Sequence, residues 1–280
     1  MFIAAIRTQF FPPGGSAPLT KANLPLQHGK VFTVTGSSSG LGYELTRILY
    51  VAGGKVYMLT RSKENAEAAM ANIKALYSSI ESIGVDLMDL NSVKRAAQAF
   101  LSWEERLDIL FNNVGTSYEY YFSINFSGGF LLTCVLSPAL SQTARNLLTN
   151  SVRVVWPPSI LVEMMSPNSG INPHFLKDSR TAWVLASEFV QQQSLTNKPV
   201  VFIAGTPGNY ITNIWRYTPA FLYYILRPIL RNPVLTVEEA QAGAYAIYDG
   251  RWHPAQRSDL VLALRTPAEG SSGRARKLFN

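Results

Sequence analysis

The chain has 280 residues, of which 47% are hydrophobic and 15% are charged, and its formal net charge is +7. This composition supports a sizeable core and excludes a disordered or collagen-like chain. The single cysteine, Cys134, excludes an intrachain disulfide framework and favours a reducing compartment, so we expect a cytoplasmic protein. The basic residues are dispersed, and no nucleic-acid-binding motif accompanies their densest run, Arg274, Arg276 and Lys277, so we expect no nucleic-acid partner.

The predicted elements alternate between strands and helices from residue 30 onward. Runs rich in β-branched residues predict strands over 30–35, 55–60, 79–86, 107–111, 151–155, 199–203 and 260–264. Stretches with apolar residues at helical spacing predict helices over 40–51, 62–77, 92–103, 126–142, 182–193 and 238–248. This alternation predicts an α/β fold, a doubly wound parallel sheet with helices on both faces, which binds ligands at the carboxyl ends of its strands.

The chain is expected to form one domain over 29–265, with an N-terminal arm over 1–28 and a tail over 266–280. No apolar run reaches the ~18 residues of a membrane-spanning helix. The first residues also lack the basic start and long apolar core of a signal peptide.

A glycine-rich turn, TGSSSGLG, follows the first predicted strand. Gly36 permits a tight turn, and Gly40 and Gly42 allow backbone and helix to approach a pyrophosphate closely. The free N–H groups and the positive dipole end of the next helix favour a phosphate. The alternative is a Gly/Ser turn without a ligand. We assign Gly36, Ser38, Ser39, Gly40, Leu41 and Gly42 to a dinucleotide site.

This TGxxxGxG turn resembles that of the short-chain dehydrogenase/reductase family, and further segments agree with it in order. QFFPP, GYELTRILY and GRWHP resemble fungal members related to retinol dehydrogenases, so the resemblance spans nearly the whole chain. It implies a single-domain Rossmann-type fold and a nicotinamide cofactor. The cofactor-binding segments that the resemblance adds are the adenine-flanking pair Asp86-Leu87, the NNAG-like Asn112-Asn113-Val114-Gly115, and the PG turn Pro207-Gly208 with Thr212 after it.

The end of the second predicted strand bears on the choice of cofactor. An acidic residue there would accept hydrogen bonds from an NAD ribose and repel a 2′-phosphate, but the sequence reads Thr60-Arg61-Ser62-Lys63. Arg61 would instead pair with that phosphate, assisted by neighbouring serines or Lys63. We therefore predict NADP(H); the alternative for Arg61 is an exposed loop arginine.

The resemblance also implies a catalytic Asn, Ser, Tyr and Lys. Asn125 lies where the family has its helix Asn, which supports a proton-relay water. Ser159 falls on the serine that binds the reacting oxygen, although Pro157-Pro158 before it is unusual and an ordinary loop serine is the alternative. Tyr would exchange a proton with the substrate oxygen, and Lys would lower the pKa of that Tyr.

The Tyr and Lys positions depart from the pattern. An ungapped count back from the next helix places Phe175 at the Tyr position and Ser179 at the Lys position. Aligning Ser179-Arg180 with the family's Ser-Lys pair places Leu176 and Arg180 there instead. Neither Phe nor Leu donates a proton, whereas Arg180 would still hydrogen-bond a ribose.

Two loops that border the same pocket are shorter than in the family, one after Gly115 and one after Ser159. Their joint loss fits remodelling for another task, and it equally fits a skipped exon in the gene. His174 is the first candidate for a substitute acid, because histidine titrates near neutral pH, and Tyr210 is a second. Scattered histidines and one cysteine do not make a metal site, so we predict none.

The segment 217–230, YTPAFLYYILRPIL, is strongly apolar and lies within the expected lid, about 207–232. The first interpretation is a lining for a small hydrophobic substrate. The second is peripheral membrane contact by an amphipathic helix. The third is burial against another subunit, since family members commonly form dimers or tetramers, and we expect a homo-oligomer.

Three functions follow from these patterns. The first is an NADP(H)-dependent oxidoreductase of a hydrophobic carbonyl, alcohol or secondary-metabolite intermediate, with an atypical proton donor. The second keeps the fold but performs non-redox chemistry, such as isomerisation, cyclisation or dehydration. The third is an inactive scaffold or the product of a truncated gene. The first is our prediction for the chain.

Overall fold

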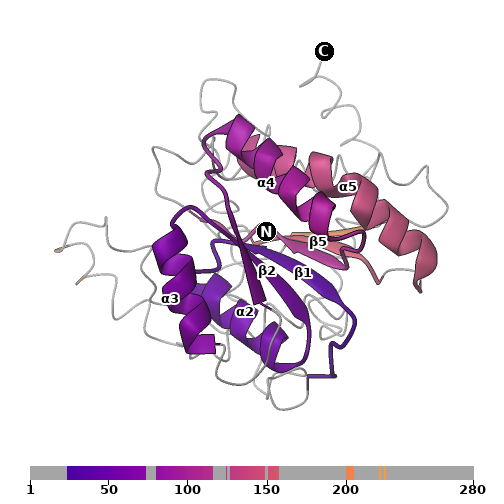
Figure 1. Cartoon of the computed structure of the whole chain (residues 1–280), viewed down its shortest axis with the longest axis horizontal. Helices are drawn as coiled ribbons and strands as arrows, with labels where there is room; N and C mark the ends of the chain where they lie inside the picture. The colour runs from indigo at the N-terminus through magenta and orange to yellow at the C-terminus, as the bar shows by residue number, and fades with distance from the viewer. Residues whose placement is uncertain are drawn as a thin grey trace, which may run out of the picture.

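The computed structural model describes residues 24–73, 80–115, 124, 127–148, 151–157, 200–204, 221 and 224. These residues form an alternating α/β chain (Figure 1). The elements are β1 (Val31–Thr35), α2 (Gly40–Val51), β2 (Lys55–Thr60), α3 (Lys63–Ile73), β3 (Ile80–Gly84), α4 (Leu90–Trp103), β4 (Ile109–Phe111), α5 (Gly129–Asn146), β5 (Arg153–Trp156) and β6 (Val201–Ala204).

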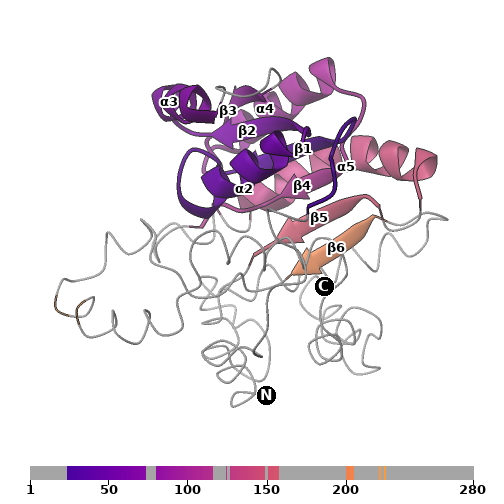
Figure 2. The same cartoon turned by 90° about the horizontal axis from the view of Figure 1, so that it is seen from below.

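The strands form one parallel sheet in the order β3-β2-β1-β4-β5-β6, which Figure 2 shows along the sheet. The central strand β1 pairs Phe32 with Val56 of β2 on one side and with Ile109 of β4 on the other. The strand order therefore reverses between β1 and β4, where doubly wound sheets bind ligands. This arrangement confirms the predicted Rossmann-type fold.

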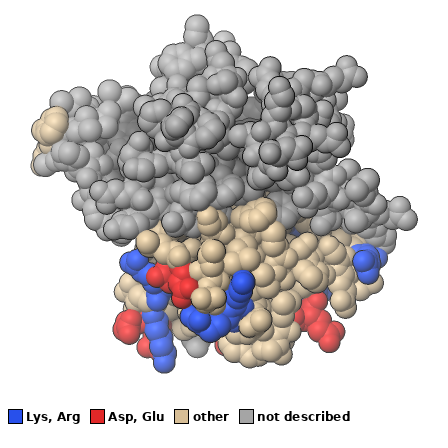
Figure 3. All heavy atoms as spheres, turned by 90° about the horizontal axis from the view of Figure 1, so that it is seen from above, with Lys and Arg blue, Asp and Glu red and all other residues tan. Residues whose placement is uncertain are grey.

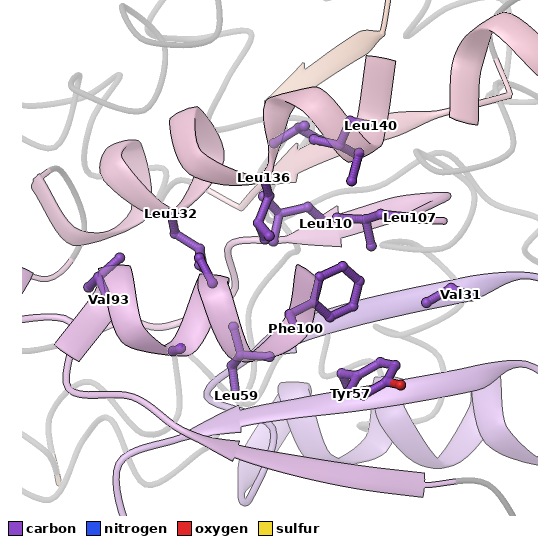
Figure 4. Close-up of a cluster of buried hydrophobic side chains, with 14 of the residues drawn as sticks. Val31, Tyr57, Leu59, Val93, Phe100, Leu107, Leu110, Leu132, Leu136 and Leu140 are labelled. Carbon is purple, nitrogen blue, oxygen red and sulfur yellow. The ribbon is translucent and has the colours of Figure 1, made fainter. Parts of the chain in front are cut away.

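Helices cover both faces of the sheet, with α2 and α3 below it and α4 and α5 above it in Figure 1. Phe32 and Val34 of β1 pack with Leu45 and Leu49 of α2 in the lower core. The upper core joins Leu110 of β4 to α4 and α5 through the side chains drawn in Figure 4. Every residue of β1 is buried, as expected for a central parallel strand that is covered on both faces.

Some observed bounds differ from the predicted ones, and capping explains two of them. Helix α4 begins at Leu90 rather than 92, because the Asp89 side chain accepts a hydrogen bond from the Asn91 N–H at 2.9 Å. Helix α3 begins one residue later than predicted, because Ser62 Oγ accepts from the Asn65 N–H at 3.1 Å.

Other bounds shift by a few residues. Helix α5 runs over Gly129–Asn146 rather than 126–142, and β4 is shorter than predicted because its first two expected residues precede the ladder. Strand β3 is likewise shorter, while β5 and β6 begin two residues later and end one residue later than predicted. The end of the predicted helix over 62–77, the helices over 182–193 and 238–248, and the strand over 260–264 lie outside the described residues.

Basic and acidic side chains lie side by side on the described part of the face that Figure 3 shows. This mixing agrees with the dispersed charge of the sequence on that face. Among the described helices, none has the length and apolar character needed to cross a membrane.

Candidate functional site

The site lies at the carboxyl ends of β1 and β4. Thr35 ends β1, and its Oγ1 donates to the Phe111 carbonyl at 3.3 Å and accepts from the Val114 N–H at 3.1 Å. Asn113 Nδ2 donates to the Thr35 carbonyl at 3.2 Å. The predicted glycine loop and the predicted Asn112-Asn113-Val114-Gly115 segment are therefore joined by direct hydrogen bonds, although nearly 80 residues separate them in the sequence.

The glycines of the loop are required by the local geometry. Gly36 and Gly40 have φ values of +65° and +57°, in the left-handed region that favours glycine. A Cβ on Gly42 would collide with the Gly36 carbonyl oxygen and lie 2.5 Å from Asn113 Nδ2. The start of α2 thus packs directly on the turn, as a pyrophosphate-binding loop needs.

The N-terminus of α2 carries unused polar groups. Ser39 is the N-cap residue, but its side chain makes no hydrogen bond to the helix, and the first turn contains no acidic residue. Ser37 is fully buried, and its Oγ has no hydrogen-bond partner among the described residues. The N–H groups of the first helical turn, the positive dipole end and the Ser37 hydroxyl together fit an anionic ligand such as a pyrophosphate.

The end of β3 is held in a fixed turn. Asp86 Oδ1 accepts from the Met88 N–H at 3.0 Å, and the Asp86 N–H donates to Ser92 Oγ at 3.0 Å. Leu87 is buried, and a Cβ on Gly128 would collide with its carbonyl oxygen. The predicted adenine-flanking pair is thereby positioned on the same edge of the sheet as the glycine loop.

Arg61 lies just beyond β2 and is exposed to solvent. An acidic group that the sequence pattern did not single out lies nearby: Glu64 in the first turn of α3 accepts a hydrogen bond from Ser62 Oγ at 2.8 Å. The backbone N–H of Glu64 and the Ser62 hydroxyl lower the pKa of this carboxyl, so it stays ionised at neutral pH. The charge beyond β2 is therefore mixed. Lys63 Nζ also lies 3.8 Å from Glu67 Oε1 in the same segment.

A small recess opens behind the loop, with a buried amide and a buried indole in its wall. Asn112 Nδ2 donates to Thr133 Oγ1 at 3.0 Å, and that hydroxyl donates to the Gly129 carbonyl at 2.8 Å. Among the residues that the structure describes, Asn112 Oδ1 and Trp156 Nε1 have no hydrogen-bond partner. No local sequence pattern pointed to Thr133, Gly129 or Trp156 as neighbours of Asn112. The lining residues are Thr35, Leu87, Asn112, Val114, Ile124, Gly129 and Trp156.

The predicted cofactor residues from Gly36 to Gly115 lie within the described residues, and the hydrogen bonds of Thr35 join the glycine loop to the segment after β4. No group of three or more His, Cys, Asp or Glu that could hold a metal occurs in the described part of the chain. Burial raises the pKa of the Cys134 thiol in α5. The predicted residues that lie outside the described ranges are Asn125, Ser159, His174, Arg180, Pro207, Gly208, Tyr210 and Thr212.

Comparison with known proteins agrees with this geometry. The family model for short chain dehydrogenases matches residues 30–152. A short-chain dehydrogenase/reductase of Phomopsis amygdali is 33% identical, with 97% of this chain and 93% of the relative covered. An uncharacterized oxidoreductase of Schizosaccharomyces pombe is 32% identical over 73% of this chain and 67% of that protein. The chain therefore belongs to the short-chain dehydrogenase/reductase family, a family of oxidoreductases.

Solved structures support the same fold. The RhlG/NADP complex of Pseudomonas aeruginosa superimposes with a TM-score of 0.65 at 24% identity, covering 81% of this chain and 93% of that one. The 3-ketoacyl-(acyl-carrier-protein) reductase of Brucella melitensis, complexed with NADH, gives a TM-score of 0.62 at 21% identity. This match covers 79% of this chain and 91% of that one.

Proposed function

We propose that the chain is a nicotinamide-dependent oxidoreductase that binds its cofactor across the carboxyl ends of β1, β2, β3 and β4. The observation that carries this proposal is the glycine loop, in which the left-handed Gly36 and the close approach of Gly42 leave space only for backbone. The start of α2 and Ser37 would hold the pyrophosphate, and the Asp86-Leu87 turn would flank the adenine. When bound, the nicotinamide supplies or accepts the hydride.

We propose NADP(H) as the preferred cofactor. Arg61 is exposed just beyond β2, where an NAD-binding member would carry an acid, and a guanidinium pairs with a 2′-phosphate in a bidentate manner. Glu64 opposes this preference, because its ionised carboxylate lies three residues further along. A Glu64→Gln variant is therefore expected to bind NADPH more tightly, and an Arg61→Gln variant more weakly.

The proposed substrate is a hydrophobic carbonyl or alcohol. Ser159 would bind the reacting oxygen, Asn125 would support a water that relays a proton, and His174 or Arg180 would occupy the place of the missing Tyr–Lys pair. The apolar segment 217–230 supports an apolar pocket. Two of its residues are described, Phe221 and Tyr224, which are helical and 69% and 68% exposed.

The decisive experiment is an assay of NADPH consumption by the full chain with a panel of hydrophobic ketones and aldehydes. Stoichiometric oxidation of NADPH and formation of an alcohol are the expected results. Matched Ser159→Ala and His174→Asn variants assign the roles, since loss of kcat with unchanged NADPH affinity identifies a group that acts on the substrate. Failure across the panel despite NADPH binding would contradict the redox proposal.

A second candidate is a non-redox enzyme that retains the fold, for which the missing Tyr–Lys pair is the specific observation. An isomerised, cyclised or dehydrated product that forms without any change in NADPH absorbance would establish it. A folded chain that binds no dinucleotide would instead support a scaffold.

We also propose that the exposed aromatic pair Phe221 and Tyr224 marks a contact surface. Both residues are helical and three positions apart in the sequence, a spacing that places two side chains on one side of a helix. In the sequence Arg227 follows, a group that anionic lipid would attract. Co-sedimentation with anionic vesicles, lost in Phe221→Ser, would support membrane contact. A concentration-dependent mass that the same variant lowers would instead support a subunit interface.

A further inference from the structure

Two adjacent buried glycines lie at the start of α5, Gly128 as its N-cap and Gly129 as its first residue. Glycine is disfavoured inside a helix, and helix ends use it mainly for its backbone freedom. Gly128 does not use that freedom, because its φ of −67° and ψ of −50° are ordinary helical values that any residue adopts. The reason for a glycine at this position therefore lies in the atoms around it.

The turn after β3 fills the space that a side chain on Gly128 would need. A Cβ there would collide with the Leu87 carbonyl oxygen, and it would lie 2.8 Å from Leu87 Cβ and 3.0 Å from the Leu87 carbonyl carbon. Hydrogen bonds fix this turn, because the Asp86 N–H donates to Ser92 Oγ and Asp86 Oδ1 accepts from the Met88 N–H, both at 3.0 Å. The start of α5 therefore packs directly on the backbone of the turn that is predicted to flank the adenine.

The end of β5 limits the space for a side chain on Gly129. A Cβ there would lie 3.0 Å and 3.2 Å from Cζ3 and Cη2 of the Trp156 ring. This ring is 2% exposed, and the Trp156 backbone pairs with Ala204 of β6, so the ring moves only if its surroundings move as well. The Gly129 carbonyl accepts from Thr133 Oγ1, which itself accepts from Asn112 Nδ2. The glycine pair thus packs near the ends of β3 and β5 and is hydrogen-bonded to the end of β4.

We propose that Gly128 and Gly129 are positioning residues, which allow the start of α5 to contact the elements that border the two halves of the dinucleotide. This inference rests on the proposed cofactor site. A dinucleotide bound where the strand order reverses, with its adenine at the turn after β3, extends its nicotinamide half toward β4 and β5. Gly128 contacts the β3 side, and Gly129 contacts the β5 side. A methyl group on each glycine should therefore displace a different half of the site.

The test compares Gly128→Ala and Gly129→Ala in calorimetric titrations of the full chain with NADPH and with ADP-ribose, which lacks the nicotinamide. Gly128→Ala is expected to weaken both ligands about tenfold, because displacement of the Leu87 turn affects the adenine that they share. Gly129→Ala is expected to weaken NADPH about tenfold and to leave the affinity for ADP-ribose unchanged. Gly84→Ala, where a Cβ meets nothing within 4 Å, is the matched control and should change neither affinity.

A second substitution separates positioning from a general loss of packing. Trp156→Phe removes Cζ3 and Cη2, the ring atoms that a methyl group on Gly129 would meet, so it is expected to restore the NADPH affinity of Gly129→Ala. It should not restore Gly128→Ala, whose methyl group meets a backbone carbonyl. If Gly128→Ala does not fold, Gly129→Ala with and without Trp156→Phe tests the inference alone.

The outcomes distinguish this inference from the proposed function. Equal weakening of both ligands by both glycine variants, no weakening by either, or no rescue by Trp156→Phe would overturn the inference while dinucleotide binding by the wild type stands. Absence of binding by a folded wild-type chain would instead contradict the proposed function, and the inference with it.

Discussion

The two edges of the sheet differ in how certain of their buried polar groups are hydrogen-bonded. At the amino edge, Asp108 is 2% exposed and fully engaged, since it accepts from the Val31 N–H at 2.9 Å and from two guanidinium nitrogens of Arg106 at 2.7 Å. Glu104 at the same edge binds both Lys55 and the Tyr57 hydroxyl. At the carboxyl edge, by contrast, Ser37 Oγ, Asn112 Oδ1 and Trp156 Nε1 have no hydrogen-bond partner within the described part of the chain.

The paired groups at the amino edge are expected to contribute to stability, and the groups at the carboxyl edge are expected to contribute to ligand binding. Asp108 and Glu104 at the amino edge link strand ends and helix ends through hydrogen bonds. Because these groups already have partners, they do not require a ligand. Buried polar groups at the carboxyl edge that lack a partner among the described residues are unfavourable, and a polar ligand would satisfy them. Substitutions at the two edges should therefore separate into effects on unfolding and effects on binding.

The largest effect is expected for Gly42→Ala at the carboxyl edge. Its methyl group would meet the Gly36 carbonyl and Asn113 Nδ2, so the glycine loop must move away from α2. We expect loss of NADPH binding in calorimetry and a free energy of unfolding lower by about 3 kcal/mol in denaturant titration. The matched control Gly84→Ala has open space around its Cβ and should change stability by less than about 1 kcal/mol. Intact NADPH affinity in Gly42→Ala would count against the proposed loop function.

The next effect is expected for Asp108→Ala at the amino edge. The change leaves the buried Val31 N–H without its acceptor and removes the partner of Arg106, which should lower the free energy of unfolding by about 2 kcal/mol. Asp108→Asn keeps an acceptor for the Val31 N–H and should therefore lower the free energy of unfolding by less. Both variants should bind NADPH as the wild type does, and a weakened affinity would show that the two edges are coupled.

A smaller effect is expected for Arg61→Gln. Loss of a charged partner for the 2′-phosphate should weaken NADPH binding about tenfold at an exposed position and leave NADH binding unchanged. Lys94→Gln is the matched control, because Lys94 is also exposed, carries the same charge and has no assigned role at the phosphate. Equal weakening of both dinucleotides by Arg61→Gln would argue against a contact with the 2′-phosphate.

The smallest effect concerns alkaline stability. Burial and the hydrogen bond to Glu104 raise the pKa of Tyr57 from 10.0 to about 12. The folded chain therefore keeps this proton more tightly than the unfolded chain, and stability that is fully present below pH 10 falls as the pH rises toward 12. Tyr57→Phe should flatten this fall in chemical unfolding curves, whereas Phe100→Leu should keep it. An unchanged slope in Tyr57→Phe would contradict the assignment.

Local patterns in the sequence, together with the family resemblance, predicted most of the described fold and the position of the glycine loop. The bounds of α2 and β2 match the prediction, because β-branched runs and the glycine turn are local signals. The contact of Gly129 with Trp156, and the hydrogen bond from Asn112 to Thr133, could not be predicted, because each joins residues more than 20 positions apart. The roles of Asn125, Ser159, His174 and Arg180 stay predictions.

A calorimetric titration of the full wild-type chain with NADPH and then NADH tests the central claim most directly. The unused donors at the start of α2 and the exposed Arg61 predict saturable binding of one dinucleotide per chain, with NADPH the tighter of the two. Absence of binding by either dinucleotide to a chain shown to be folded would contradict the account.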